Sequence, residues 1–251
     1  MLRVQNVGVR FGGIVALDNV SFDVPSGAIV GLIGPNGAGK TTLFNCLSRL
    51  YECGSGEILF DGSSILKLPT HRIAEIGIGR TFQIPRPFAE MTVLENVLSG
   101  GQDQAGEHIW MNFLRPGRVA AQEKAAVERA RGLLDFVTLS ALEGQPARIL
   151  SGGQRKLLEL ARILMADPRA ILLDEPAAGV NPALLELIID RVLDLNRRGK
   201  SILLIEHNME MVSRLCGRVV VMAAGRHLTE GAPAEVARNP AVIEAYLGGV
   251  A

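Results

Sequence analysis

The segment Gly34–Thr41 constrains the fold of this chain more than any other part of the sequence. It fits the pattern G-x-x-x-x-G-K-[ST], with Lys40 and Thr41 as its last two residues. The apolar run Ala28–Ile33 before it suits a buried parallel strand, and a helical pattern runs from near Lys40 to about Leu50. A strand, a glycine-rich loop and a helix in this order predict a phosphate-binding loop in an α/β protein.

The residue types in this segment match the chemistry of a phosphate site. Glycines let the backbone approach phosphate oxygens, and the following helix N-terminus favours negative charge. Lys40 supplies a charge for the β- and γ-phosphates, and the Thr41 hydroxyl completes a Mg²⁺ ligand set. A glycine-rich turn before an ordinary helix is the alternative, and the strand–loop–helix setting argues against it. The predicted nucleotide-binding residues here are Gly34, Pro35, Asn36, Gly37, Ala38, Gly39, Lys40, Thr41 and Thr42.

Length, charge and cysteine usage narrow the class of protein. The 251 residues suit one large domain or a domain with a small lobe. The formal net charge of zero indicates neither a nucleic-acid track nor an anionic membrane surface. The three cysteines show no CxxC spacing, which argues against a zinc site or a disulfide framework and favours a reducing cytosol. We find neither a signal-peptide pattern nor ~18 unbroken apolar residues, so a membrane function would need a partner.

Two acids, Asp174 and Glu175, follow the apolar run Ala170–Leu173. Open α/β sheets bind ligands at the carboxyl ends of their strands. We therefore expect Asp174 to hold Mg²⁺ through water and Glu175 to orient and deprotonate the attacking water. An acidic turn capped by Pro176 is the alternative, and the phosphate loop upstream favours the catalytic interpretation.

Further apolar runs predict a parallel sheet. Ile202–Ile205 and Val219–Met222 read as compact strands with helical patterns between them. His207 follows the first of these strands in the same topological position as Glu175. A lone histidine there is more often structural, but its place at a strand end favours a contact to the γ-phosphate.

The stretch from about Pro85 to Leu150 has helical spacing instead of strand patterns, as at Val127, Ala130, Leu133, Leu134 and Val137. It predicts a helical lobe inserted into the α/β core. Within it, the turn-rich segment 101–118 contains Trp110, and we expect an exposed loop or short helix there.

The segment Leu150–Gln154 begins a strongly amphipathic helix. Ser151 and Gln154 have the spacing of a capping box, which explains the helix start. It does not explain Gly152 and Gly153, because glycine in a first turn weakens a helix by up to ~1 kcal/mol. A phosphate that must approach bare backbone at a helix N-terminus does explain them.

On these residues the chain resembles the ATP-binding cassette superfamily over essentially its whole length. The resemblance implies an α/β fold with a P-loop NTPase core, an antiparallel β subdomain and an inserted helical lobe. It implies ATP and Mg²⁺ as cofactors. It also implies head-to-tail packing of two cassettes, in which the signature residues Ser151, Gly152, Gly153 and Gln154 of one cassette face the ATP of the other. The match consists of Gly34–Thr41, Gln83 within Thr81-Phe82-Gln83, Leu150–Gln154, Leu172–Glu175 and His207.

Further roles come from the resemblance alone. Gln83 would link the Mg²⁺ shell to the helical lobe and the membrane partner, and Phe11 would lie under the adenine unless it is a core residue of an early strand. Asn181 stands where many members have Asp; it is also a good helix cap, and its role across a dimer stays open. The implied metal ligands are Thr41, Gln83 and Asp174, and the implied catalytic residues are Glu175, His207 and Gln83.

The implied architecture is a single nucleotide-binding domain over 1–251. Residues 1–84 and 151–251 would form the α/β core with its antiparallel β lobe, residues 85–150 the helical subdomain, and residues 233–251 a C-terminal helical tail. After Gln83, a mixed apolar surface is expected either to receive a short cytoplasmic helix of a membrane partner or to pack inside the lobe. Its residues are Ile84, Pro85, Pro87, Phe88 and Met91.

Four segments are similar to the branched-chain amino acid importers. They are Ile78–Gln83, the insert around Trp110, Ile205–Met209 and Asn239–Gly248. The similarity implies an ATPase that powers import of branched-chain or other hydrophobic amino acids, or related amides, from the cytoplasmic face of the inner membrane. The implied partners are a second cassette subunit, identical or different, two integral membrane permeases and, indirectly, a periplasmic substrate-binding protein.

Other assignments fit less well. The lipopolysaccharide-export cassettes share a similar Tyr-Leu-Gly tail, but the insert and Arg80-Thr81-Phe82 favour the importer. Soluble cassette proteins acting on DNA or ribosomes carry two cassettes or coiled-coil arms, whereas this chain has one cassette and no sustained heptads, so no nucleic-acid partner is expected. A switch that binds without hydrolysing conflicts with an intact Glu175 and His207. The sequence of a cassette does not identify the transported molecule, because the cassette does not touch it.

Overall fold

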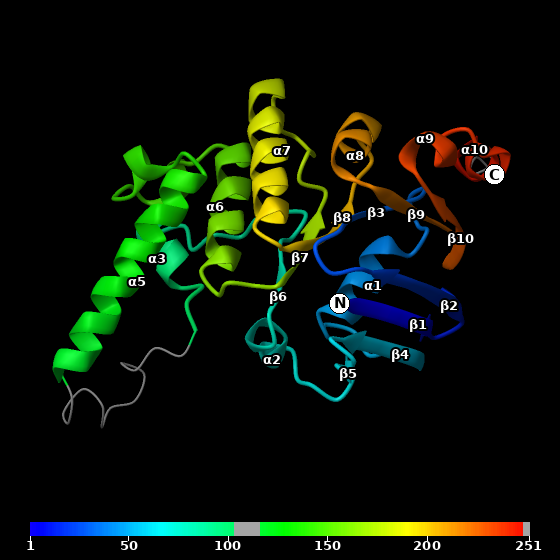
Figure 1. Ribbon diagram of the computed structural model, residues 1–251, viewed down its shortest axis with the longest axis horizontal. Coiled ribbons are helices and arrows are strands. Elements are labelled where there is room, and N and C mark those ends of the chain that lie inside the picture. Colours follow the sequence, from blue (N-terminus) through cyan, green and yellow to red (C-terminus); the bar gives the residue numbers. More distant parts are fainter. Residues whose placement is uncertain (103–115, 248–251) are drawn as a thin grey trace. The chain divides into compact units, whose positions relative to one another are not determined.

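The computed structural model describes residues 1–102 and 116–247, which fall into two compact units (Figure 1). The first unit contains Met1–Gln83, Arg169–Ala178 and the chain from Leu185 onward. The second contains Ile84–Pro168 and Gly179–Leu184. The prediction for the insert around Trp110 lies outside the described residues.

A six-stranded sheet forms the centre of the first unit, in the order β10-β9-β3-β8-β7-β6. Neighbouring strands from β9 to β6 run parallel, and β10 adds an antiparallel edge. All residues of β3, β7 and β8 are buried, as expected for strands covered on both faces. Four predicted apolar runs are therefore confirmed as strands: β3 (Ile29–Ile33), β7 (Ala170–Asp174), β8 (Ser201–Ile205) and β9 (Arg218–Ala223). The two edge strands, β6 (Ile78–Arg80) and β10 (Arg226–Gly231), were not predicted from the sequence.

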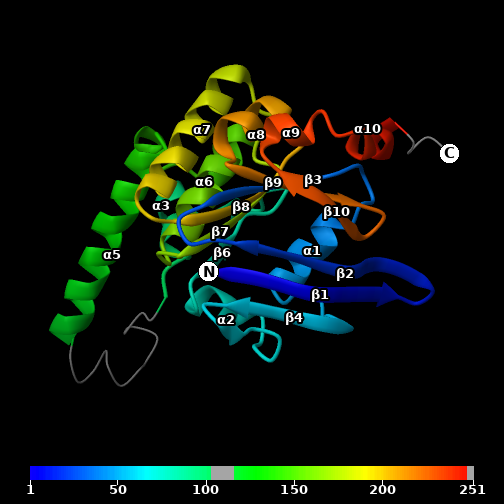
Figure 2. The same ribbon diagram turned by 45° about the vertical axis from the view of Figure 1, so that its right-hand side comes forward.

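A second, antiparallel sheet has the order β2-β1-β4-β5. Its strands are β1 (Leu2–Phe11), β2 (Ile14–Val24), β4 (Ser55–Phe60) and β5 (Ser63–Ser64). Helix α1 (Lys40–Leu47) lies between this sheet and the six-stranded one (Figure 2). Its Leu43, Phe44 and Leu47 share one apolar cluster with residues of both sheets. The helix that carries Lys40 is thus held from two sides, and the predicted α/β fold with an antiparallel β lobe is confirmed.

The remaining helices of the first unit are α2 (His71–Glu75), α8 (Met209–Leu215), α9 (Pro233–Val236) and α10 (Pro240–Leu247). Helix α8 packs on β3, where a Cβ at Gly31 would lie 3.6 Å from Val212 Cγ1 and 3.1 Å from Cys216 Sγ. Helix α7 (Pro182–Arg197) begins at the predicted Pro182, and Asn181 Oδ1 accepts a 2.9 Å hydrogen bond from Leu184 N. Asn181 is therefore a helix cap.

The second unit is helical, with α3 (Val93–Leu98), α5 (Pro116–Phe136) and α6 (Gly152–Leu164) packed on one another. Short 3₁₀ turns at Ser140–Leu142 and Ala147–Ile149 lead into α6. The apolar stripe of α6, including Leu157, Leu160 and Leu164, is buried, as its amphipathic pattern predicts.

Candidate nucleotide-binding and hydrolysis site

The loop Gly34–Gly39 between β3 and α1 has three glycines with positive φ, and two of them, Gly34 and Gly39, also lack room for a side chain. Gly34 has φ 149° and Gly39 has φ 95°, which L side chains rarely adopt. A Cβ at Gly34 would lie 2.1 Å from Met222 O, and one at Gly39 would lie 2.7 Å from Ala16 O. At these two positions the backbone therefore packs tightly against β9 and β2.

Lys40 closes the loop onto itself. Its Nζ donates to Gly34 O at 2.7 Å and to Pro35 O at 2.9 Å, and the residue is buried. Burial lowers the pKa of Lys40, while the charges of Glu175 and Asp174 oppose that shift. The amine thus lies inside the loop, where it can exchange carbonyl partners for phosphate oxygens.

Asp174 ends β7 and is almost fully buried, with a side chain 4% exposed. Its Oδ2 lies 3.2 Å from Arg80 Nη2, and its backbone N–H donates to Thr81 Oγ1 at 3.2 Å. Burial raises the pKa of Asp174 above its usual value, although the neighbouring Arg80 guanidinium opposes this shift.

Glu175 is held by the side chains of two other predicted site residues. Gln83 Nε2 donates to Glu175 Oε2 at 2.6 Å, and His207 Nε2 lies 3.0 Å from Glu175 Oε1. Its backbone is left-handed, with φ 48°, and its N–H donates to Ile205 O at 3.0 Å. The structure therefore brings Gln83, Glu175 and His207 together, as three segments far apart in the sequence.

Glu206 holds the backbone around this cluster and was not among the predicted site residues. It is buried, and its carboxylate accepts three backbone N–H groups, from Ala177 at 2.6 Å, His207 at 2.9 Å and Asn208 at 3.0 Å. One buried acid thus ties the turn after Glu175 to the turn that carries His207. The sequence shows that Glu206 directly follows an apolar run, but it does not show which backbone groups the carboxylate binds.

The predicted Mg²⁺ ligands are all oxygen donors. Thr41 offers a hydroxyl, Asp174 a carboxylate, and Gln83 a side-chain carbonyl oxygen, since its amide nitrogen faces Glu175. Hydroxyl, carboxylate and carbonyl oxygens are what a hard cation such as Mg²⁺ prefers. The chemistry of this donor set fits the predicted ion.

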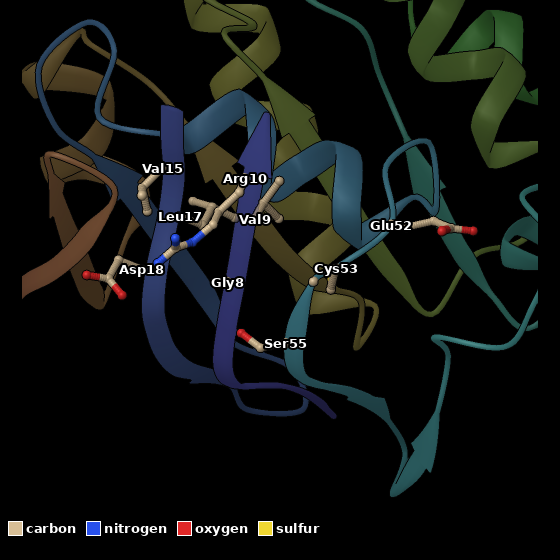
Figure 3. A pocket seen from close by; sticks show the side chains of 10 residues that line it. Gly8, Val9, Arg10, Val15, Leu17, Asp18, Glu52, Cys53 and Ser55 are labelled. Carbon is tan, nitrogen blue, oxygen red and sulfur yellow. The ribbon is translucent and has the colours of Figure 1, made fainter. Parts of the chain in front are cut away.

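Phe11, predicted under the adenine, is 46% exposed and so is not a core residue. Its ring meets the edge of the Tyr51 ring at 5.3 Å and 75°. Residues of β1, β2 and the segment at the start of β4 line a cavity of about 410 Å³ (Figure 3). Some of these residues are near Phe11 in the sequence. The lining of the cavity includes Arg10, Val15 and Cys53, and no predicted phosphate-loop or catalytic residue.

The signature segment heads α6 in the second unit. Ser151 Oγ accepts from Gln154 N at 3.2 Å, and Gln154 Oε1 accepts from Ser151 N at 2.9 Å, which is a complete capping box. A Cβ at Gly153 would lie 1.8 Å from Leu184 Cδ2, so packing within the unit already favours glycine there. Only Gly152 faces open space, with nothing within 4 Å of an added Cβ.

The apolar surface after Gln83 is exposed in the second unit. Phe88 is 51% exposed, and the Arg162 guanidinium lies 5.4 Å from its ring centroid. Buried Asn96 fixes the backbone beneath, accepting from Phe88 N at 2.8 Å and donating to Phe88 O at 3.0 Å. Burial of Phe88 inside the lobe, the alternative considered from the sequence, is therefore wrong.

These features define the class of protein. A strand, a glycine-rich loop and a helix lie at the carboxyl edge of a mostly parallel sheet, and two acids stand at the carboxyl end of a second strand of that sheet, one strand away. This is the arrangement of a P-loop nucleotide-binding domain.

Comparison with known families makes the assignment specific. The ABC transporter family matches residues 17–178. A second family, the branched-chain amino acid ATP-binding cassette transporters, matches residues 226–251. The chain belongs to the ATP-binding cassette family of ABC transporters, and the resemblance inferred from its motifs is confirmed.

Curated relatives agree over the full length. A probable branched-chain amino acid transport ATP-binding protein LivG of Archaeoglobus fulgidus is 42% identical over 248 residues, covering 99% of this chain and 95% of the relative. The high-affinity branched-chain amino acid transport ATP-binding protein LivG of Escherichia coli K12 is 39% identical over 249 residues, covering 99% and 98%.

Solved structures share the fold. A nucleotide-free ATP-binding cassette from an ABC transporter has a TM-score of 0.85 at 37% identity, covering 98% of each chain. The ADP conformation of such a cassette has a TM-score of 0.83 at 37% identity, covering 99% of this chain and 98% of the other. A dimeric cassette bound to ADP and Pi has a TM-score of 0.77 at 26% identity, covering 93% and 99%. Cassettes of this family thus bind adenine nucleotides.

Within 1–102 and 116–247, the chain offers no helix with the length and apolar character needed to cross a lipid bilayer.

Proposed function

We propose that this chain is the ATP-hydrolysing subunit of a membrane importer for branched-chain or related hydrophobic amino acids. The proposal that the chain hydrolyses ATP rests on the position of Glu175. Its carboxylate contacts Gln83 and His207 at the carboxyl edge of the sheet that also carries the phosphate loop. The substrate class is supported by the names of the relatives and by the family that matches the C-terminal residues.

In the proposed reaction, the loop Gly34–Gly39 and the N-terminus of α1 bind the β- and γ-phosphates. Lys40 turns from its loop carbonyls to the phosphates, which are stronger acceptors for an ammonium group. Mg²⁺, when bound by Thr41, Gln83 and Asp174, would neutralise phosphate charge. Phe11, 46% exposed at the end of β1, would stack on a nucleobase.

Glu175 is the proposed general base. Its carboxylate orients the attacking water and takes its proton, while Gln83 and His207 fix the direction of the two oxygens. His207 Nε2 is also the proposed contact to the γ-phosphate, since it lies at the carboxyl end of β8, next to that of β7.

We further propose that two cassettes enclose ATP head to tail, as the dimeric solved structure supports. Ser151, Gly152 and Gln154 of one cassette would then meet the nucleotide on the phosphate loop of its partner. The other partners would be two permeases, bound at the exposed surface around Phe88, and a periplasmic binding protein beyond them. This places the chain at the cytoplasmic face of the membrane.

The test is Glu175→Gln in purified protein. The amide keeps the shape of Glu175 but accepts no proton, so ATP binding should persist while turnover falls by about 100-fold or more. Glu186→Gln is the matched control, because Glu186 is an exposed acid of α7 that pairs with Arg214 of α8 and has no proposed role in the reaction. Turnover of Glu175→Gln equal to that of Glu186→Gln, at saturating Mg-ATP, would remove Glu175 from this role.

A further inference from the structure

Arg80 is a buried cation next to Asp174, one of the proposed metal ligands. It ends β6, three residues before Gln83, and its side chain is only 7% exposed. A guanidinium keeps its charge in any protein environment, so a buried one needs several partners. The described contacts of Arg80 reach α1, β7 and the ring of Phe82.

Arg80 forms hydrogen bonds with Asn45 of helix α1 and with Ser48, which directly follows it. Its Nη1 donates to Asn45 Oδ1 at 2.8 Å and to Ser48 Oγ at 2.7 Å. The rings of Phe44, also on α1, and Phe82 lie 5.6 Å and 5.2 Å from the guanidinium carbon. Two aromatic faces and two hydrogen bonds therefore fix the plane of the guanidinium.

Arg80 also pairs with Asp174. Its Nη2 donates to Asp174 Oδ2 at 3.2 Å, and the next residue, Thr81, accepts from the Asp174 backbone N–H at 3.2 Å. Side chain and backbone of Asp174 are thus both held by one dipeptide. A carboxylate engaged through one oxygen keeps the other for a further partner.

We propose that Arg80 is the positioning residue that orients the Asp174 carboxylate for Mg²⁺ and ties that orientation to α1, the helix that carries Lys40 and Thr41. Arg80 itself touches neither nucleotide nor metal. This inference rests on the proposed function, because it takes Asp174 as the metal-binding acid. Groups that orient a metal-binding residue from behind typically contribute about 10- to 100-fold in metal affinity.

A competing interpretation gives the opposite sign. If Arg80 only places positive charge beside the site, its removal would strengthen binding of a cation by reducing repulsion. If Arg80 orients Asp174, its removal weakens Mg²⁺ binding, although a positive charge has been taken away. The direction of the change therefore separates orientation from simple electrostatics.

The experiment measures the affinity of the full chain for the fluorescent nucleotide mant-ADP, in MgCl₂ and in EDTA. Arg80→Lys keeps the charge but loses the planar fork, so it cannot hold Asn45, Ser48 and Asp174 together. Arg80→Gln removes the charge and keeps a hydrogen-bond donor. We expect both to lose about 10- to 100-fold of the Mg²⁺-dependent gain in affinity, with affinity in EDTA unchanged. In an Asp174→Asn background, Arg80→Lys should have no further effect on this gain.

The control is Arg169→Lys. Arg169 lies 4.9 Å from the Phe60 ring and pairs with Asp61, so it repeats the aromatic and acidic contacts of Arg80 on the surface of the same unit. A Mg²⁺-dependent gain in both Arg80 variants that equals the gain of Arg169→Lys, or exceeds it, overturns the proposal. So does failure of both variants to fold, judged by circular dichroism, because Arg80 would then be a requirement of the fold. Absence of nucleotide binding by the wild-type chain is a different result, since it refutes the proposed function itself.

Discussion

Single residues at this site hold positions that the local chain does not favour. Glu175 has a left-handed backbone, which costs an L residue roughly 1–2 kcal/mol. Its N–H bond to Ile205 and its carboxylate contacts to Gln83 and His207 offset that cost. Backbone strain of this kind is typical of functional positions, where the surrounding structure fixes the conformation.

The cysteines show the same dependence on surroundings. Burial raises the pKa of Cys216 to about 12. The pKa of Cys46 is raised by its hydrogen bond to Cys53 and by burial, whereas that hydrogen bond and nearby Arg49 lower the pKa of Cys53. Cys53 also lines the cavity of Figure 3 and is only half-buried.

We therefore predict that iodoacetamide at pH 8 modifies Cys53 first in the native protein. The thiolate is the reactive form, and each pKa unit changes its fraction about tenfold below the pKa. Peptide mass spectrometry over a time course measures the three rates. In guanidinium chloride the three cysteines should react at similar rates. Faster native labelling of Cys216 than of Cys53 would contradict the assignment.

At the scale of elements, polar side chains shape the loop that precedes α3. Asn96 is buried, and its amide bonds the backbone of Phe88, Met91 and Thr92 at 2.8–3.3 Å. Thr92 and Glu95 add a capping box at the start of the helix. The loop can therefore present the Phe88 ring to solvent without losing its own shape.

For this surface we predict that Phe88→Ala weakens association with the permease partners and lowers uptake, with ATPase of the isolated chain nearly unchanged. Large aromatic side chains dominate such interfaces, and truncation of one commonly costs about 2 kcal/mol or more of binding. Co-purification with the permeases, transport in vesicles and ATPase turnover are the measurements.

Leu228→Ala is the control, since Leu228 is 38% exposed on β10 in the other unit. A fall in melting temperature together with lost ATPase would instead assign Phe88 to stability. Normal assembly and uptake in a well-folded Phe88→Ala protein would place the docking surface elsewhere.

At the scale of the whole molecule, the phosphate loop and the signature belong to different compact units. In the proposed sandwich, each signature serves the nucleotide of the partner chain. Gly152 gives a clean probe of this arrangement, because nothing lies within 4 Å of an added Cβ. Gly153 is a poor probe, because its added Cβ would collide with Leu184.

We predict that Mg-ATP promotes dimerisation in the Glu175→Gln background and that Gly152→Asp abolishes this effect. Aspartate in a first helical turn favours the helix, so loss of the dimer would report charge repulsion against a phosphate and not a melted α6. Light scattering with and without Mg-ATP gives the mass. Nucleotide binding to the chain's own phosphate loop should persist.

Gly144→Asp is the matched control, as Gly144 is an exposed glycine of the same unit with equally open space around its Cβ. A Gly152→Asp protein that dimerises like Gly144→Asp would refute the head-to-tail geometry. Where the physiological partner is a second, different cassette, both chains are mixed before the measurement.

The sequence by itself determined the class of fold and the position of the phosphate loop. Buried parallel strands need unbroken apolar runs, and a loop that packs bare backbone against neighbouring strands needs glycine at Gly34 and Gly39, so both leave local traces. The start of α7 at Asn181-Pro182 and the capping box of α6 were predictable for the same reason, because caps act within four residues.

Only the tertiary structure decided the contacts of Arg80 and Glu206 and the exposure of Phe88. Arg80 meets Asp174 across 94 residues, and Gln83 meets Glu175 across 92, because adjacent strand ends bring them together. Nothing in the local chain records such partners. Glycine at Gly153 has a second reason, contact with Leu184, that appears only once α6 and the start of α7 are placed. Helix caps and phosphate loops are formed by consecutive residues, so the sequence can show them. Burial and side-chain contacts depend on which distant segments the sheet and helices bring side by side.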